Sequence, residues 1–412
     1  RDQPRSRGLG DVYKRQDMKI RGSYGSLGNQ VMDDLGNFPY LATYGTNSSY
    51  NYLINGSKPV IVKAPGLVAP DFTWETVTQM DFGFDASFLN NRLTGTFDWY
   101  RRNTKDMLVA GATLPATLGA SVPKSNSADM KTIGWELSLG WNDRLENGFS
   151  YWVKGVLSDY QATITKYAGN DAGFYSQSDG DGKYYVGQKI GEIWGYHSNG
   201  LFQSDDEAAT IDQSELYAGK WGAGDVKYED LDNDGKITKG EETIYNPGDK
   251  SIIGNKTPRY QFGITVGFDY KNFDFEMFWQ GTGKRDYMLS GAQFWGFTSQ
   301  WDVPYTPALD YWTETNTDAY FPRPGWQNGG NRVTSDRYLQ SAAYGRLKNL
   351  TVGYTIPKNL TTKWGISRLR LYVTGENLLT ITPLNDAFDP ETLGGMTYPI
   401  NRKVAIGLNL TL

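Results

Sequence analysis

The amino-acid sequence predicts an all-β fold: an antiparallel, up-and-down transmembrane β-barrel that is present only in part and carries long extracellular loops. Three observations lead to this prediction. Apolar and polar residues alternate over runs longer than the usual strand of about five or six residues. The connections between these runs are alternately short and long. The 412-residue chain also lacks an uninterrupted apolar run near the roughly 18 residues that a bilayer helix needs, whereas barrel strands alternate and stay polar on average.

The alternation is clearest between residues 80 and 88, where one set of side chains is apolar and the intervening set is polar or small. The apolar set is Met80, Phe82, Phe84, Ala86 and Phe88, and the other set is Asp81, Gly83, Asp85 and Ser87. The same division recurs in the segments 133–142, 260–268, 273–280 and 404–412. A two-residue repeat is typical of strands with one apolar and one polar face, and helices do not produce it.

The lengths of the connections predict the order of the strands. Short turns are expected at Asn90-Asn91, Glu146-Asn147 and Lys271-Asn272, and a somewhat longer turn begins at Pro357. Long connections are expected over 30–72, 110–128, 166–256, 287–336 and 382–396, which are too long for an ordinary sandwich. We therefore predict ten strands with every long loop on the same side: 17–29, 73–89, 92–109, 129–143, 148–165, 257–270, 273–286, 338–356, 367–381 and 397–412.

A soluble β-sandwich is the alternative interpretation of the alternation, because its strands also have one inward and one outward face. The composition excludes several other classes of protein. The chain has no Cys, which removes disulfides, thiol catalysis and cysteine zinc sites. It has a single His, His197, so a Ser-His-Asp triad would have to be built around that one imidazole. We expect His197 to be an ordinary loop residue.

Residues 1–16 show none of the alternation that begins at Met18. The segment is rich in arginine and begins with Arg1. We expect it to be a non-native or read-through segment, and we expect residues 17–412 to form the barrel segment.

Many short motifs between residues 17 and 412 occur together in one order. The most informative are Trp74-Glu75-Thr76-Val77-Thr78-Gln79, Phe88-Leu89-Asn90-Asn91-Arg92-Leu93-Thr94-Gly95, Gly134-Trp135-Glu136, Gly200-Leu201-Phe202-Gln203, Arg346-Leu347-Lys348-Asn349-Leu350 and Gly375-Glu376-Asn377-Leu378-Leu379. In these motifs the segment resembles the barrel of the SusC/RagA family of TonB-linked outer-membrane transporters.

This resemblance implies a barrel of 22 strands, of which the chain carries the ten C-terminal ones, with the first half and the plug domain upstream. It also implies a location in the bacterial outer membrane and TonB-dependent uptake of oligosaccharides or peptides. The implied partners are a SusD-like surface lipoprotein, the TonB complex by way of the upstream region, and outer-membrane lipid. No enzymatic activity is expected.

The longest predicted loop contains a calcium-binding motif, which runs from Asp230 to Glu241. Carboxylates at alternate positions, a glycine for the sharp turn and a final glutamate match the twelve-residue calcium loop. The expected metal ligands are Asp230, Asp232, Asp234, Glu241 and the backbone carbonyl of Lys236, with Thr238 holding a water. The alternative is an acidic surface turn that binds no metal.

Acidic residues are concentrated around this motif. Residues 167–250 contain 17 Asp and Glu against 7 Lys, a net charge of −10, although the whole chain carries only −5. A nucleic-acid partner is therefore not expected, because binding to phosphates depends on basic surfaces.

Aromatic residues in the predicted loops are the candidates for substrate contact, because sugar rings stack on such faces. The candidates are Trp194, Tyr196, Trp221, Trp295 and Trp301, with Tyr305, Trp312 and Trp326 also in the loops. The same residues also suit packing of the loops against one another, which is the more usual role of such a residue. Two further hypotheses for the whole protein therefore stay open: a secreted or surface β-protein that binds glycans, and a barrel hydrolase.

Overall fold

The computed structural model describes residues 15–29, 40–47, 53–58, 60–63, 65–69, 72–110, 115, 117, 122–167, 173, 184–393 and 398–412. All ten predicted strands are present, and they form one sheet. Their bounds are β1 (Arg15–Asn29), β4 (Glu75–Phe88), β5 (Leu93–Ala110), β6 (Lys124–Arg144), β7 (Ser150–Tyr167), β12 (Arg259–Tyr270), β13 (Phe273–Lys284), β16 (Tyr344–Thr355), β17 (Arg368–Ile381) and β18 (Lys403–Thr411). Residues 1–14 of the predicted non-native segment lie outside the described residues.

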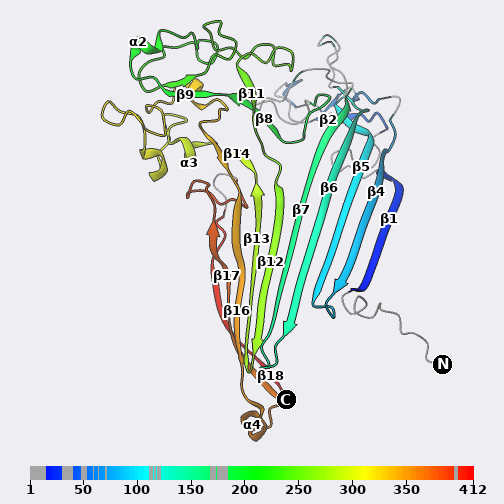
Figure 1. The fold of residues 1–412 in the computed structure, drawn as a ribbon. Helices are drawn as coiled ribbons and strands as arrows, with labels where there is room; N and C mark the ends of the chain where they lie inside the picture. Colours follow the sequence, from blue (N-terminus) through cyan, green and yellow to red (C-terminus); the bar gives the residue numbers. More distant parts are fainter. Residues whose placement is uncertain are drawn as a thin grey trace, which may run out of the picture.

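The sheet follows the chain order from β1 to β18, and every neighbouring pair is antiparallel. Figure 1 shows it as a tall, curved wall. β1 and β18 are the two end strands, and no pairing joins them within the described residues. The predicted up-and-down topology is confirmed, and this part of the chain forms an open sheet.

The register places residues of like polarity in rows across the strands. One row consists of Ile20, Phe84, Phe97, Leu137, Leu157 and Phe262. The row one residue away consists of Arg21, Gly83, Asp98, Glu136, Ser158 and Gln261. Because successive side chains of a strand point to opposite faces, the sheet has one apolar face and one polar face, as the alternation predicts.

Ion pairs cross the polar face from strand to strand. Arg21 of β1 contacts Asp85 of β4 at 2.7 Å and Asp98 of β5 at 2.9 Å. Further along the sheet, Arg370 pairs with Asp274. These charges lie on a wet face, whereas the opposite face exposes large apolar side chains such as Phe82, as expected for a wall between lipid and a polar lumen.

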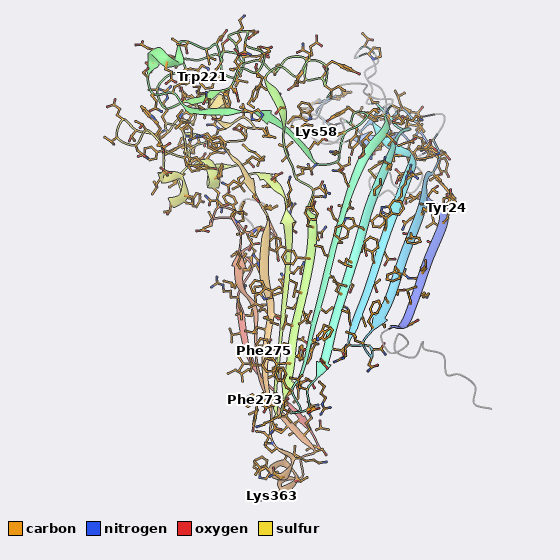
Figure 2. The ribbon with its side chains drawn as sticks, viewed as in Figure 1. Tyr24, Lys58, Trp221, Phe273, Phe275 and Lys363 are labelled. Carbon is orange, nitrogen blue, oxygen red and sulfur yellow. The ribbon has the colours of Figure 1, made fainter. Side chains whose placement is uncertain are left out.

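Short turns and long connections lie at opposite ends of the wall (Figure 1). The turn between β16 and β17 is the longest at its end, and it contains α4 (Lys358–Thr361) and the 3₁₀ helix η4 (Thr362–Trp364). Figure 2 places Lys363 at the tip of this turn and Trp221 among the long connections at the other end. No helix in the described part of the chain is long and apolar enough to cross a bilayer.

Three strand boundaries differ from the prediction by five residues or more. β6 begins at Lys124 rather than at 129, and β18 begins at Lys403 rather than at 397. β16 begins at Tyr344 rather than at 338, because residues 339–341 form a separate strand, β15 (Leu339–Ser341), which pairs with β14 (Asp286–Met288). The break falls where the amide of Ala342 donates to the carbonyl of Arg285 at 2.7 Å.

The long connections contain short elements of their own. They are β2 (Gly45–Asn47), β3 (Ile61–Lys63), β8 (Glu192–Tyr196), β9 (Ser198–Leu201), α2 (Asp205–Ala208), β10 (Val226–Tyr228), β11 (Lys250–Asn255), α3 (Ala292–Trp295), η2 (Thr306–Leu309) and η3 (Gly329–Arg332). β8 pairs with β11, and β9 pairs with β10.

Residues 184–258, 285–343 and 382–393 pack into one unit, which we call the loop body. Its hydrophobic core combines residues of all three connections: Tyr196, Leu201, Val226, Tyr228, Ile237, Met288, Leu289, Phe294, Phe321, Tyr338, Ala342, Leu384, Phe388 and Leu393. The long connections are therefore a folded structure with its own core, held at one end of the sheet.

Candidate functional site

The acidic motif of the loop body folds as a tight turn around the Asp230 carboxylate. Asp230 Oδ1 accepts from the amide of Asn233 at 2.7 Å, and its Oδ2 accepts from the amide of Gly235 at 2.8 Å. Gly235 has a φ of +84°, which a glycine adopts without strain. The turn of the predicted calcium loop is present because backbone amides close it around an aspartate.

Three carboxylates of the described residues come together at this turn. Oxygen atoms of Asp230, Asp232 and Asp249 all lie within 4.8 Å of one another. Asp249 is fully buried, and it accepts from the amides of Leu231 and Thr238 at 2.7 Å each. It lies beyond the twelve-residue motif, so the spacing rule did not include it; the only sequence signal for it is a further acidic residue in an already acidic segment.

The predicted convergence of four motif carboxylates is wrong in part. Asp234 and Glu241 are not in the group of three. Asp234 Oδ1 accepts instead from the amide of Lys236 at 2.8 Å. Glu241 lies in a backbone hairpin, where its amide donates to the carbonyl of Asn246 at 3.0 Å. The chain turns back after Gly240, and Asp249 rather than Glu241 is the third carboxylate of the group.

The surroundings shift two of these carboxyl groups in opposite directions. Local desolvation and then the charge of Asp234 raise the pKa of Asp232. For Asp230, desolvation acts in the same direction, but the amides of Gly235, Asn233 and Asp234 hold its pKa below the usual value. Crowded carboxylates of this kind repel one another unless a cation lies between them.

Calcium binding at this turn stays a prediction, and the structure gives it a sharper test. Asp249→Asn is expected to weaken calcium binding by roughly tenfold or more, because the number of charged oxygen ligands sets the affinity of such loops. Glu241→Gln is expected to change it much less. Calorimetric titration with calcium measures both. A larger effect of Glu241→Gln than of Asp249→Asn would restore the ligand set of the sequence motif, and no heat at millimolar calcium would leave an acidic turn without metal.

Two glycines make a close crossing behind this turn. Gly240 and Gly248 have φ values of +58° and +61°, and a Cβ on either would lie 2.5 Å from the backbone nitrogen of the other. Gly248→Ala therefore combines a steric clash with a left-handed conformation that costs about 1–2 kcal/mol.

We expect Gly248→Ala to raise the rate of amide hydrogen exchange between residues 238 and 249, measured with calcium chelated. Gly235→Ala is the matched control, because its φ is also positive but no atom lies within 4 Å of the added Cβ. An equal effect of the two variants would contradict the close crossing.

The five aromatic candidates for substrate contact have different positions. Tyr196 is 3% exposed and belongs to the core of the loop body. Trp221 and Trp295 pack against this core, and Trp194 lies in β8, with its ring 6.5 Å from that of Tyr185. Trp301 is 83% exposed. The prediction that Tyr196 stacks on a substrate is not supported, because its buried ring has no open face.

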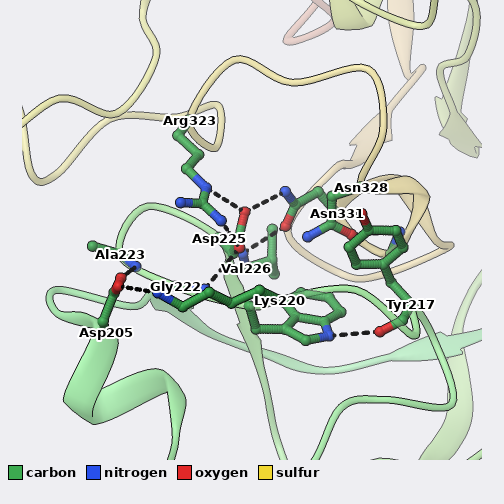
Figure 3. A network of polar contacts seen from close by, with 12 residues as sticks. Asp205, Tyr217, Lys220, Gly222, Ala223, Asp225, Val226, Arg323, Asn328 and Asn331 are labelled. Atoms are coloured by element: carbon green, nitrogen blue, oxygen red, sulfur yellow. Dashed lines mark hydrogen bonds and ion pairs between the residues drawn. The ribbon is translucent and has the colours of Figure 1, made fainter.

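A buried ion pair joins two connections of the loop body, as Figure 3 shows. Asp225, 1% exposed, accepts from Arg323 Nε at 2.9 Å and from Arg323 Nη2 at 2.6 Å. It also accepts from Asn331 Nδ2 at 2.8 Å and from the amide of Gly222 at 3.0 Å. The nearby pair of Lys220 and Asp205 is exposed. Sequence analysis missed Asp225 and Arg323, because 98 residues separate them.

The single histidine also bridges connections of the loop body. His197 Nδ1 lies 2.8 Å from Asp336 Oδ2, and Nε2 lies 2.6 Å from Ser251 Oγ. Asp336 also accepts from the amide of Ser198 at 2.9 Å. The three side chains have the pairing of a hydrolase triad, and they join residues 197 and 251 to a third segment at residue 336.

The family comparison decides between the hypotheses left open by the sequence. The family model described as "TonB dependent receptor-like, beta-barrel" matches residues 8–378. The chain belongs to this family. It is an outer-membrane protein, and its sheet is part of a TonB-dependent receptor barrel.

Relatives with known names support this assignment. The chain is 29% identical over 95% of its length to TonB-dependent receptor P3 of Formosa agariphila, and 26% identical over 98% to TonB-dependent receptor SusC of Bacteroides thetaiotaomicron. It covers 39% and 38% of these two proteins, so it spans about two fifths of the curated relatives it matches. Both relatives are named as receptors, which favours the receptor interpretation over the barrel hydrolase.

Solved structures show the same fold. The RagAB peptide transporter superposes with a TM-score of 0.74 at 21% identity, over 98% of this chain and 42% of that one. Its "closed-closed" state gives a TM-score of 0.72 at 22% identity, again over 98% of this chain and 42% of that one. At this coverage the aligned region includes both the sheet and the loop body.

Proposed function

We propose that the chain forms the C-terminal part of the barrel of a transporter that takes up oligosaccharides or peptides through the outer membrane. A SusD-like surface lipoprotein partners it, and the TonB complex energises it through the upstream region. The observation that carries this proposal is the loop body: three long connections with a shared hydrophobic core stand at one end of a receptor-family barrel wall.

The architecture supports uptake better than it supports a secreted glycan-binding protein. The apolar face of the sheet exposes rows of large side chains, among them Phe82, Leu139 and Val373 at 51%, 49% and 47%. A secreted protein would expose this surface to water, whereas an outer-membrane wall presents it to lipid.

Growth and uptake assays test the proposal in a bacterium that carries the intact protein. Deleting the gene is expected to abolish uptake of one class of fluorescently labelled nutrient, either an oligosaccharide or a peptide pool, and depletion of TonB is expected to have the same effect. Affinity purification of the intact protein is expected to retain a surface lipoprotein. Uptake of both pools that is unchanged by the deletion would contradict a transport role.

A further inference from the structure

A band of aromatic side chains crosses the apolar face of the sheet beside the short turns. Phe268 lies on this face, because an even number of residues separates it from Phe262 of the apolar row. Its ring lies 5.0 Å from that of Phe275 on the neighbouring strand, and the ring of Phe273 lies 4.7 Å from that of Tyr354. Figure 2 labels Phe273 and Phe275 near the short-turn end of the wall. The strand pairing joins these residues in two rows, which we call the aromatic band: Tyr151, Phe268 and Phe275, and then Tyr270, Phe273 and Tyr354.

The aromatic band lies where a barrel wall passes from lipid to water. Tyr270 ends β12 and Phe273 begins β13, and only the turn Lys271-Asn272 separates them. Short turns of outer-membrane barrels face the periplasm. Aromatic rings collect at the level of the lipid headgroups, because the ring is apolar and a tyrosine hydroxyl reaches water. The apolar face of the wall meets lipid, so the band marks the headgroup region of the periplasmic leaflet.

A lysine lies over the edge of the aromatic band. The Nζ atom of Lys271 is 5.1 Å from the centre of the Tyr270 ring, and the residue is exposed. Within the described part of the chain, Lys271 takes part in no ion pair. The neighbouring acidic residues Asp269 and Asp274 lie opposite each other on the polar face, where Arg370 pairs with Asp274. The ammonium group of Lys271 is therefore available to an anion at the level of the headgroups.

The longest periplasmic turn adds positive charge beside this lysine. The strand before it ends at Thr355, whose amide donates to the carbonyl of Asn272 at 2.8 Å, so the two turns are neighbours. Lys358 and Lys363 of the longer turn are both exposed. The segment 337–375, which includes this turn, contains no Asp or Glu. The turn therefore presents only positive charge to the membrane surface.

A membrane lipid fits this combination better than a soluble acidic partner does. A soluble protein or peptide would reach the lysines from water and would make no use of the aromatic band, which lies against lipid. A phospholipid matches both features, because its acyl chains pack along the rings and its phosphate forms charge-assisted hydrogen bonds with an ammonium group. The positive turn also favours a headgroup with net negative charge over a zwitterionic one.

We propose that the short-turn end of the wall binds a phospholipid with a negatively charged headgroup in the periplasmic leaflet. The phosphate pairs with Lys271, and the acyl chains lie along the aromatic band. Lys358 and Lys363 attract headgroups of the same charge. This inference goes beyond the transport function: it depends on the outer-membrane location and not on which nutrient is carried.

Native mass spectrometry of the purified intact protein in detergent tests the proposal without any transport step. The protein is titrated with phosphatidylglycerol and with phosphatidylcholine of the same acyl chains, which share the phosphate and differ in net charge. We expect phosphatidylglycerol to bind at least about fivefold more tightly, roughly the effect of one basic residue at an anionic surface. Equal binding of the two lipids would overturn the proposal. Displacement of phosphatidylglycerol by excess glycerol 3-phosphate would also overturn it, because the site would then bind soluble phosphate.

The variant Lys271→Gln is expected to weaken binding of phosphatidylglycerol about fivefold and to leave that of phosphatidylcholine within about twofold. Lys271→Arg keeps the charge and is expected to bind phosphatidylglycerol within about twofold of the unchanged protein. Lys154→Gln is the matched control, because Lys154 is also exposed but lies on the polar face, opposite Thr265. A loss in the control or in the arginine variant equal to that in Lys271→Gln would refute the site. Because binding is measured apart from uptake, failure here leaves the transport proposal standing.

Discussion

Phe294→Ala is expected to lower the free energy of unfolding of the loop body by about 3–5 kcal/mol, the usual cost of removing a buried phenylalanine ring. Phe294 is fully buried, and its ring lies 5.0–6.4 Å from those of Trp295, Tyr320, Phe321, Tyr338 and Phe388. No other ring in the described residues makes as many contacts of this kind. Its loss leaves a cavity that several rigid rings cannot fill together.

Amide hydrogen exchange of the loop body measures this effect, since the sheet and the loop body are followed separately. Phe273→Ala is the matched control, because Phe273 lies in β13 with 54% of its surface exposed (Figure 2). Protection of residues 226–228 and 320–323 is expected to fall sharply in the Phe294 variant only. Unchanged protection there would mean that the loop body does not depend on this core.

Arg323→Ala is expected to be about as damaging, with a cost of about 3–5 kcal/mol, because it leaves the buried Asp225 carboxylate without its counter-charge. Asp225→Asn is expected to cost less. In that variant the Arg323 side chain, which is 40% exposed, is able to reach water. The side-chain oxygen of the new asparagine still accepts from the backbone amide of Gly222. Arg323→Ala is therefore expected to be the less stable variant, because it leaves a charged carboxylate buried, whereas Asp225→Asn leaves a charged guanidinium that water can reach.

Lys220→Ala is the control for this pair. The Lys220 side chain is 78% exposed and its partner Asp205 is 54% exposed, so the change is expected to lower stability far less than Arg323→Ala does, because solvent screens an exposed pair. The free energy of opening of the amides of Gly224 and Val226, from hydrogen exchange, measures all three variants. If Arg323→Ala lowers the free energy of opening no more than Lys220→Ala does, a structural role of the buried pair is contradicted.

The sheet was predictable from the sequence because its determinants are local. Strand alternation such as that of Met80 to Phe88, and turns such as Asn90-Asn91, depend on residues close together in the chain. β6 and β18 deviate at their ends on the loop side, where the alternation gives way to loop sequence. The sequence predicts β13 with the start of β14, and β15 with β16, as continuous strands. The break between them depends on the hydrogen bond from the amide of Ala342 to the carbonyl of Arg285, which joins residues far apart in the sequence.

The loop body was predictable only in outline. The acidic turn follows from the local pattern Asp230 to Gly235, but the approach of Asp249 depends on a chain reversal that no spacing rule describes. Tyr196 and Trp301 have the same aromatic character in sequence, yet one is buried and the other is exposed. Burial, cavities and ion pairs such as Asp225 with Arg323 arise from contacts between connections that are about a hundred residues apart.

The composition of the loop-body core has a consequence for the order of assembly. Leu384, Phe388 and Leu393, from the connection before the last strand, complete a core whose other members come from residues 196–342. Asp389 and Glu391 of the same connection bind Arg346, at 2.5 and 3.0 Å. Neighbouring strands pair as soon as both are present, but contacts of high sequence separation form late. The extracellular end of this protein is therefore finished only when the chain is nearly complete, and a product that stops short of residue 382 forms hairpins while leaving Phe294 and its neighbours uncovered.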